Sequence, residues 1–412
     1  MNTDQSDVIV VGAGALGAST ALHLVKAGVE NVVLVDKDGP GSGTSKAGAG
    51  FVGPLAAGWD AGWGRSELDV EYFSIDFYSD LATRHDIDFR HSGHLYIARD
   101  ADAWKHVAKF HDTDTVPDSQ LVEPDEIRAV TKGFLDGSSF HRAVFQPSAV
   151  QLSAGKAARA IAAEFATLGG RVESRRPVTG LIKIGNAVTG VETEHGPLYA
   201  DKVVVAGGSW SNTILGGDYF LPQVPLVLSR MITEPLNVPA NFPALNFAGY
   251  SDDGSGLLWV REDCGRLNWG MSYPDYPRDD LVDNPIPDRF DDIRLDGIFQ
   301  VRRASQSLTH LMPGLATDKF WVAHGAPCLT PDRRALIGPI DERPGLYVVG
   351  GCNGVGIQHG PGWGKVAAEI VTGATPFVDA RPWNANRFGG LYSTNRDVFL
   401  ALSARSGPMT HV

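Results

Sequence analysis

One stretch decides the fold: residues 7–17 read DVIVVGAGALG. The short run Asp7–Val11 predicts a β-strand, and the residues after the glycines predict a helix that ends at Gly28. A second apolar run, Val32–Val35, leads directly into Asp36. This order predicts a β-α-β unit of about thirty residues, which opens a Rossmann-type domain.

The glycines of this stretch have the GxGxxG spacing of a dinucleotide site. Gly12 permits the tight turn, Gly14 lets a pyrophosphate approach the backbone, and Gly17 lets the helix pack closely on the strand. Asp36, at the end of the next strand, can accept hydrogen bonds from a ribose diol. A glycine-rich turn can also merely join a strand to a helix, but a strand, a helix and an acid in one register favour nucleotide binding.

A second glycine-rich loop indicates that the site binds FAD rather than NAD. Residues 350–358 read GGCNGVGIQ and are followed by GPG at 360–362. The loop follows an apolar strand at 345–351 and precedes a predicted helix, Gly364–Thr372, so its amides can face an electron-rich ring edge. Reduced flavin carries negative charge on such an edge, whereas NAD enzymes need no element of this kind. The two loops together predict bound FAD.

The composition excludes several classes of protein. The chain has 412 residues, 43% hydrophobic and 20% charged, which suits a globular protein of two domains. Its net charge of −12 argues against binding to nucleic acid or to anionic membranes. Three scattered cysteines predict neither a disulfide framework nor a metal site. Because the start is polar and no long apolar run occurs, we expect a cytoplasmic protein.

The amino-acid composition changes in the middle of the chain. From about residue 221 to 318 it is rich in proline, with alternating segments that predict an antiparallel sheet. We therefore expect an α/β, Rossmann-type FAD-binding domain interleaved with a mainly antiparallel substrate domain. The FAD-binding domain is expected at 1–90, 141–220 and 321–390, the substrate domain at 91–140 and 221–320, and a tail at 391–412. Further predicted elements are helices at Glu67–His85 and Ser153–Leu168 and strands at Gly93–Ala98, Arg171–Ser174, Gly180–Ile184, Ala187–Thr193, Val203–Ala206, Gly256–Val260 and Arg266–Met271.

The chain resembles the glycine/sarcosine/D-amino-acid oxidase (DAO) superfamily of FAD-dependent amine oxidoreductases, and is closest in style to sarcosine oxidases and dehydrogenases. The resemblance spans nearly the whole sequence. Its landmarks, in the family's order, are GAGALG (12–17), Asp36, GTSKAGAG (43–50, the flavin loop), VVVAGGSWS (203–211), LTPDRRALIGP (329–339) and GLYVVGGCNGVGIQHGPG (345–362).

The resemblance implies a set of cofactor-binding residues and no metal. They are Gly12, Gly14, Ala15, Leu16, Gly17, Asp36, Lys37, Gly43, Thr44, Ser45, Ala49, Gly50, Val178, Ala206, Gly207, Trp210, Gly351, Asn353, Gly354, Val355, Gly356, Ile357 and Gln358.

The resemblance also implies a reaction: hydride transfer from the substrate Cα–H to flavin N5, which gives an imine that water hydrolyses. This chemistry needs no dedicated base once the amine is neutral, so the protein must supply orientation and a dry pocket. The arginine of the family's LRP-x-T segment is absent, because Ala326 and Pro327 stand there. Gln358 replaces a cation that some sarcosine-type members carry. These differences favour a small amine or an N-substituted amino acid over a plain α-amino acid.

Five residues are catalytic candidates: Gln358, His359, Asn268, Trp259 and Arg261. Gln358 and His359 follow the second glycine loop, where His359 could polarise substrate or simply pack in the core. Trp259 resembles an aromatic pocket residue of the sarcosine oxidases. Arg261 would share its sheet face because of the strand spacing, and can also be a solvated strand residue.

Two positions bear on the electron acceptor and on the flavin linkage. Asn268 stands where sarcosine-type oxidases carry a lysine that promotes reaction with oxygen, and a neutral side chain cannot stabilise superoxide in that way. We therefore expect slow use of oxygen, while oxygen, a protein and a quinone stay open as acceptors. Cys328 resembles the cysteine that bonds covalently to the flavin in monomeric sarcosine oxidases; the alternative is a buried, unreactive thiol. Trp59 and Trp63 either shape the pocket or anchor packing.

Other functions are compatible with the same fold. One is a 2-hydroxy-acid or polyol dehydrogenase, for which His359 would serve as the base. Another is the flavin subunit of a multi-protein dehydrogenase, in which the tail at 391–412 would pack on a partner. A nucleic-acid-modifying flavoenzyme is disfavoured by the acidic balance.

Overall fold

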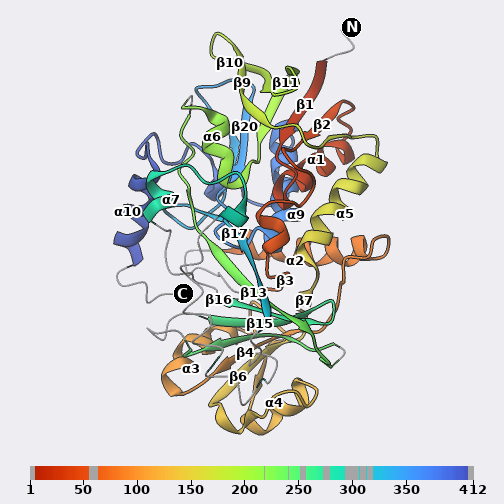
Figure 1. Cartoon of the computed structure of the whole chain (residues 1–412), viewed down its shortest axis with the longest axis vertical. Coiled ribbons are helices and arrows are strands. Elements are labelled where there is room, and N and C mark those ends of the chain that lie inside the picture. Colours follow the sequence, from red (N-terminus) through yellow and green to blue (C-terminus); the bar gives the residue numbers. More distant parts are fainter. Residues whose placement is uncertain are drawn as a thin grey trace.

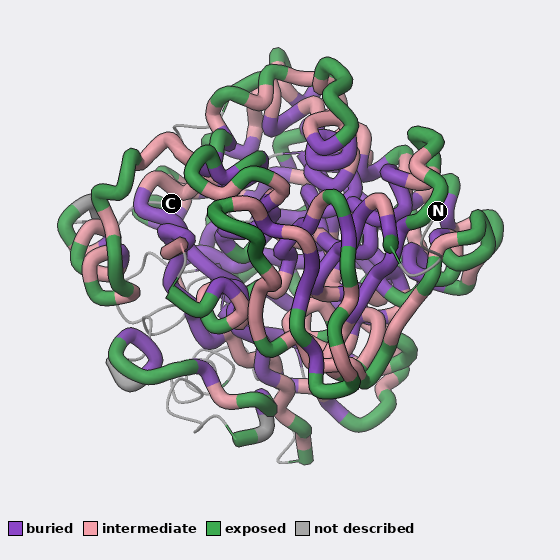
Figure 2. Tube along the Cα trace, turned by 90° about the horizontal axis from the view of Figure 1, so that it is seen from above, coloured by how far each residue is buried: buried purple, intermediate pink, exposed green. Residues whose placement is uncertain are grey.

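The computed structural model describes residues 5–54, 64–217, 219–239, 241–250, 257–271, 279–292, 306, 312 and 319–406. Its main strands form two eight-stranded sheets, which lie one above the other in Figure 1. Seen from above, buried residues gather at the centre of the molecule and exposed loops surround them (Figure 2). No helix in the described part of the chain is long and apolar enough to cross a membrane.

The first sheet is the Rossmann-type one. Its strand order is β19 (Leu336–Pro339), β20 (Leu346–Gly350), β11 (Leu198–Val205), β1 (Gln5–Val11), β2 (Val32–Val35) and β8 (Arg171–Glu173), with the hairpin β9 (Val178–Ile184) and β10 (Ala187–Thr193) attached to β11. From β20 to β8 all neighbours are parallel. Val8 and Val10 pack under the helices on one face, while Ile9 and Val11 pack into a core on the other. Burial on both faces explains the unbroken apolar run of β1.

The second sheet, called the roof sheet here, is mainly antiparallel. Its order is β17 (Phe320–Gly325), β13 (Leu228–Pro235), β16 (Arg266–Met271), β15 (Leu257–Asp263), β14 (Ala244–Ala248), β4 (His94–Ala98), β6 (Arg142–Gln146) and β5 (Gln120–Val122). Of these pairs, β14 and β4 run parallel. The predicted fold class is therefore confirmed, as are the strands predicted at Val32–Val35, Ala187–Thr193 and Arg266–Met271.

The described helices pack around these sheets, and two further pairs of short strands form ribbons of their own. The helices are α1 (Ala15–Lys26), α2 (Arg65–Ala82), α3 (Ala101–Val107), α4 (Pro124–Val130), α5 (Ala154–Thr167), α6 (Ser211–Leu215), α7 (Asp279–Asp283), α9 (Gly356–Thr372) and α10 (Asn395–Ser406). The ribbons are β3 (Phe51–Val52) with β7 (Val150–Gln151), and β12 (Val224–Pro225) with β18 (Cys328–Leu329).

Two predictions about the fold were wrong. Strands β6 and β17 belong to the roof sheet, although the predicted boundaries at 141 and 321 gave them to the FAD-binding domain. Helix α9 begins at Gly356 rather than Gly364 and contains Pro361. Proline cannot donate to the carbonyl four residues earlier, and here the Tyr78 hydroxyl donates to that Ile357 oxygen at 2.8 Å instead. A side chain of α2 thus satisfies the helix bond that proline removes.

Within the described residues, α10 (Asn395–Ser406) forms most of the predicted tail. Val398 and Leu402 of α10 are buried against residues of β12 and β18, and Arg396 forms an ion pair with Asp283 of α7. The end of the described chain therefore packs on this molecule's own core.

Candidate active site

A cavity of about 540 Å³ lies at the carboxyl ends of the parallel strands and reaches the roof sheet. Such a position is the usual ligand site of open α/β sheets. With the exception of Gly17, each predicted cofactor-binding residue lines it. Trp259 and Gln358 line it as well, whereas Arg261, Asn268 and His359 do not. Trp59 and Trp63 lie outside the described residues.

The first glycine turn forms a cradle that no side chain could share. Gly12 has a φ of 103°, and a Cβ there would lie 2.5 Å from the oxygen of Ala206. A Cβ on Gly17 would lie 1.9 Å from the oxygen of Gly12, so this glycine serves helix packing. The helix then begins at Ala15, whose amide donates to the Ser45 hydroxyl at 2.9 Å. Gly14 makes no side-chain cap, and the first residues of the helix line the cavity, where the helix N-terminus favours a pyrophosphate.

Asp36 is held in place by backbone amides. Its Oδ2 accepts from the Ala13 amide at 2.7 Å, and its Oδ1 accepts from Asp38 and Gly39 at 2.9 and 2.8 Å. Burial raises the pKa of Asp36, and these amide donors oppose that shift. A fixed carboxylate at this edge of the cavity fits the diol of a ribose.

The flavin loop, residues 43–50, is held from the roof sheet. Arg230 Nη2 donates to the Lys46 oxygen at 2.9 Å, and Arg261 Nη1 donates to the Gly50 oxygen at 2.8 Å. The same Arg261 nitrogen reaches the Leu152 oxygen at 2.5 Å. These arginines occupy the carbonyls of the loop and so fix its conformation. Arg261 is therefore neither a solvated strand residue nor a cavity residue.

The second glycine loop is positioned by buried amide side chains. Gln223 donates to the Gly208 oxygen at 2.9 Å and accepts from the Gly351 amide at 2.7 Å. Asn353 takes a φ of 49°, donates to the Gly351 oxygen at 2.6 Å and accepts from the Thr330 amide at 3.0 Å. Sequence reasoning missed Gln223, because its partners lie in two other loops and no local pattern marks it.

Aromatic and charged side chains line the end of the cavity beneath the roof sheet. Phe51 and Trp259 meet edge to face, with 6.0 Å between ring centroids. Arg230, Gly270 and Trp259 are neighbours across three strands, and a Cβ on Gly270 would lie 2.8 Å from the Trp259 ring. Arg230 also lines the cavity, 3.6 Å from Asp263, and burial lowers its pKa. This cation was not among the residues expected at the site, because Leu228–Pro235 (LSRMITEP) does not alternate regularly between apolar and polar residues.

Two catalytic candidates are buried away from the cavity. Asn268 is 1% exposed and lies opposite Arg261 in the β15–β16 register. His359 is fully buried and stacks on Trp363 at 4.5 Å between ring centroids. Burial lowers the pKa of His359 to about 3, so its ring is neutral at ordinary pH. Because α9 begins before His359, the helix turns this side chain into the core.

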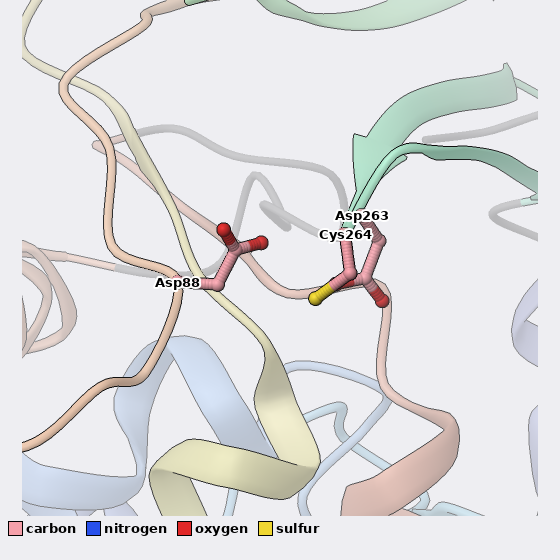
Figure 3. A group of neighbouring side chains, drawn as sticks. All are labelled: Asp88, Asp263 and Cys264. Carbon is pink, nitrogen blue, oxygen red and sulfur yellow. The ribbon is translucent and has the colours of Figure 1, made fainter. Parts of the chain in front are cut away.

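An acidic cluster beside the flavin loop is balanced by arginines. Figure 3 shows Asp263 and Cys264, at the β15–β16 turn, facing Asp88. Possible ligand atoms of the three lie within 4.8 Å of one another. Asp263 pairs with Arg261 at 2.9 Å, and Asp88 pairs with Arg90 at 3.1 Å. The cluster thus joins the β15–β16 turn of the roof sheet to the segment before β4, which contains Asp88. Its two carboxylates have arginine partners in the protein.

Cys328 lines the cavity as a buried thiol on β18. Burial raises the pKa of this thiol, with a smaller contribution from Cys352. A neutral thiol is a poor nucleophile, so the environment favours the unreactive form over covalent attachment.

Comparison with known families gives the site its context. The model of the family described as FAD dependent oxidoreductase (DAO) matches residues 7–370. The chain belongs to this family. FAD is the family's cofactor, and the glycine cradle, the fixed Asp36 and the lined cavity fit it. When bound there, FAD supplies the two-electron acceptor for substrate oxidation.

Curated relatives share much of this chain. It is 27% identical to 4-methylaminobutanoate oxidase (formaldehyde-forming) of Paenarthrobacter nicotinovorans, over 95% of this chain and 47% of that protein. It is 24% identical to human mitochondrial dimethylglycine dehydrogenase, over 94% and 45%. The chain thus spans about half the length of these relatives. It is 29% identical to glycine oxidase of Pseudomonas aeruginosa, over 91% of this chain and 97% of that enzyme.

Solved structures share the fold. L-proline dehydrogenase from P. horikoshii superposes with a TM-score of 0.77 at 22% identity, covering 94% of this chain and 98% of that one. Glycine oxidase from Geobacillus kaustophilus superposes with a TM-score of 0.74 at 22% identity, covering 93% and 99%.

Proposed function

We propose that the protein oxidises the C–N bond of a small amine or N-substituted amino acid with bound FAD as acceptor. The observation that carries the proposal is a single cavity that joins the dinucleotide cradle to an aromatic and cationic end beneath the roof sheet. Phe51 and Trp259 offer ring faces and edges to an amine and its alkyl groups. The names of the curated relatives, which include an oxidase of a methylamino acid and a glycine oxidase, support the same class of substrate.

The lining of the cavity favours amines over hydroxy acids. Oxidation of a hydroxy acid commonly uses a histidine base, and the described residues that line the cavity include no histidine. His359, the one candidate for that role, is fully buried and neutral. A neutral amine needs no such base. What this chain contributes is the orientation of the substrate and the exclusion of water.

The electron acceptor is the second part of the proposal. Asn268 does not reach the cavity, so the position that carries a lysine in sarcosine-type oxidases offers no cation here. We propose slow reaction with oxygen and transfer of electrons to a protein or a quinone.

An anaerobic screen tests the function. The purified protein is mixed with amines, N-methyl amino acids and 2-hydroxy acids, and the visible flavin bands are followed. We expect bleaching by an amine, then slow recovery of colour in air. Bleaching by hydroxy acids alone would overturn the amine assignment. Fast recovery in air would overturn only the proposed acceptor, and turnover of the isolated chain with artificial dyes would argue against a subunit that needs a partner.

A further inference from the structure

A buried carboxylate sets the orientation of the Gln358 side chain. Gln358 lies in the first turn of α9, lines the cavity and is 3% exposed. Its Nε2 donates a hydrogen bond to Oε1 of Glu71, a fully buried residue of α2. The NH₂ group of the amide is therefore the end that faces Glu71, whose carboxyl oxygen accepts this bond. The carbonyl oxygen of Gln358 then points the opposite way.

The surroundings of Glu71 show which way that is. His359 Nε2 lies 3.5 Å from Glu71 Oε1, and its ring stacks on Trp363 in the core. Gln358 thus stands between this buried acid and the cavity. Its free oxygen is the amide atom available to a ligand.

We propose that Oε1 of Gln358 accepts a hydrogen bond from an N–H of the substrate's amine, and that Glu71 is the positioning residue that fixes this polarity. The inference rests on the proposed function and narrows its substrate class to amines that carry an N–H. An ammonium N–H makes the stronger bond, because the donor is charged. An amide oxygen repels a carboxylate, so the substrate's acid group, where it has one, binds elsewhere in the cavity.

The orientation depends on Glu71 because an amide is nearly symmetric in shape. A glutamine at position 71 offers both a donor and an acceptor, so Gln358 could turn its NH₂ group toward the cavity. Glu71→Gln therefore preserves size and packing but no longer fixes which end of the Gln358 amide faces the cavity. Gln358→Met keeps the length of the side chain and removes the acceptor. Glu369→Gln, the same change on the part of α9 that pairs with Lys365, is the matched control.

The test compares binding of two ligands to the FAD-loaded protein, read from the perturbation of the flavin spectrum. One ligand is the best amine of the anaerobic screen. The other is its N,N,N-trimethyl analogue, which has no N–H at any pH. Since the added methyl groups also change size, the informative quantity is how the ratio of the two Kd values changes between variants.

We expect the wild-type protein and Glu369→Gln to bind the amine roughly tenfold or more tightly than the analogue, as a hydrogen bond to a charged group would give. Gln358→Met should lose most of this preference, and Glu71→Gln should lose part of it; the FAD content of each variant is measured, and the two Kd values are compared on the FAD-loaded fraction. An unchanged ratio of the two Kd values in Gln358→Met would overturn the inference. If Glu71→Gln does not fold, Gln358→Met still decides. If no amine bleaches the flavin, the proposed function itself fails; if amines bleach it but the analogue binds equally well, only this inference fails.

Discussion

Arg261 Nη1 lies 2.8 Å from the backbone oxygen of Gly50, so a strand of the roof sheet holds the end of the flavin loop directly. Gly50 has a φ of 77°, and a Cβ there would lie 2.5 Å from the same nitrogen. Arg261 is 1% exposed and forms an ion pair with Asp263 at 2.9 Å. The loop, the roof sheet and the acidic turn are therefore coupled through one guanidinium.

Replacing Arg261 should release both the loop and the flavin. Arg261→Met leaves Asp263 without its closest partner, and breaking a buried pair costs about 3–5 kcal/mol of unfolding free energy. We expect lower stability in urea and reduced FAD content. Arg266→Met removes a more exposed arginine from the same hairpin, which donates to the Thr233 oxygen, and should retain FAD. Full FAD content in Arg261→Met would show that the loop does not depend on this contact.

Alanine substitutions at two glycines can distinguish the effect of backbone strain from the effect of filling the nucleotide cradle. Gly12 and Gly28 both have a positive φ, at 103° and 88°. A Cβ on Gly28 meets nothing within 4 Å, whereas one on Gly12 collides with Ala206. Gly28→Ala should cost roughly 1–2 kcal/mol and keep FAD, because only strain is added. Gly12→Ala should yield colourless protein. Equal FAD content in the two variants, measured from the visible spectrum, would contradict the cradle.

Asn268→Lys should destabilise the protein rather than create an oxidase. The new ammonium would be buried opposite Arg261, where burial and a like charge both disfavour it. We expect a lower Tm and an unchanged rate of flavin reoxidation in air. Both amide atoms of Asn268 are buried without a hydrogen-bond partner in the described part of the chain, so Asn268→Leu should be neutral or stabilising. A lysine variant that is stable and reoxidises at least tenfold faster would place this position at the flavin after all.

The buried His23 should make the stability of the protein sensitive to acid. Burial, followed by the charges of Lys26 and Lys365, lowers its pKa from 6.5 to about 3. The unfolded chain therefore binds a proton that the folded chain does not, and this contribution to stability is lost as pH falls from about 6.5 toward 3. The loss per group is at most about 1.4 kcal/mol per pH unit. His23→Leu should show a shallower decline in urea unfolding free energy over that window; parallel curves for the two proteins would refute the assignment.

Local chemistry made one half of the site predictable. The GxGxxG turn, Asp36 and the second glycine loop are contiguous in sequence and carry their own backbone requirements, so their function is visible without the fold. The start of α9 could not be predicted in this way, because the Tyr78 hydroxyl that compensates for Pro361 comes from a distant helix.

The other half depends on contacts between distant residues. Glu71 and Gln358 are 287 positions apart, and Gln223 joins two loops that no local pattern connects. Apolar runs identify strands but not their partners, which is why the expected boundaries at 141 and 321 separated Arg142–Gln146 and most of Phe320–Gly325 from the sheet they join. His359 was a catalytic candidate by proximity in sequence, and the direction in which a helix turns its side chains removed it from the cavity.

One measurement tests the central claim most directly: a single turnover without oxygen, in which flavin bleaching and the organic products are counted together. The FAD-loaded protein is mixed with a limiting amount of the amine found in the screen, and the products are quantified by NMR. The account predicts one carbonyl compound and one amine or ammonia released for each flavin reduced, because cleavage of the C–N bond follows oxidation. Flavin reduction without cleavage of a C–N bond, or protein that takes up no FAD, would contradict it.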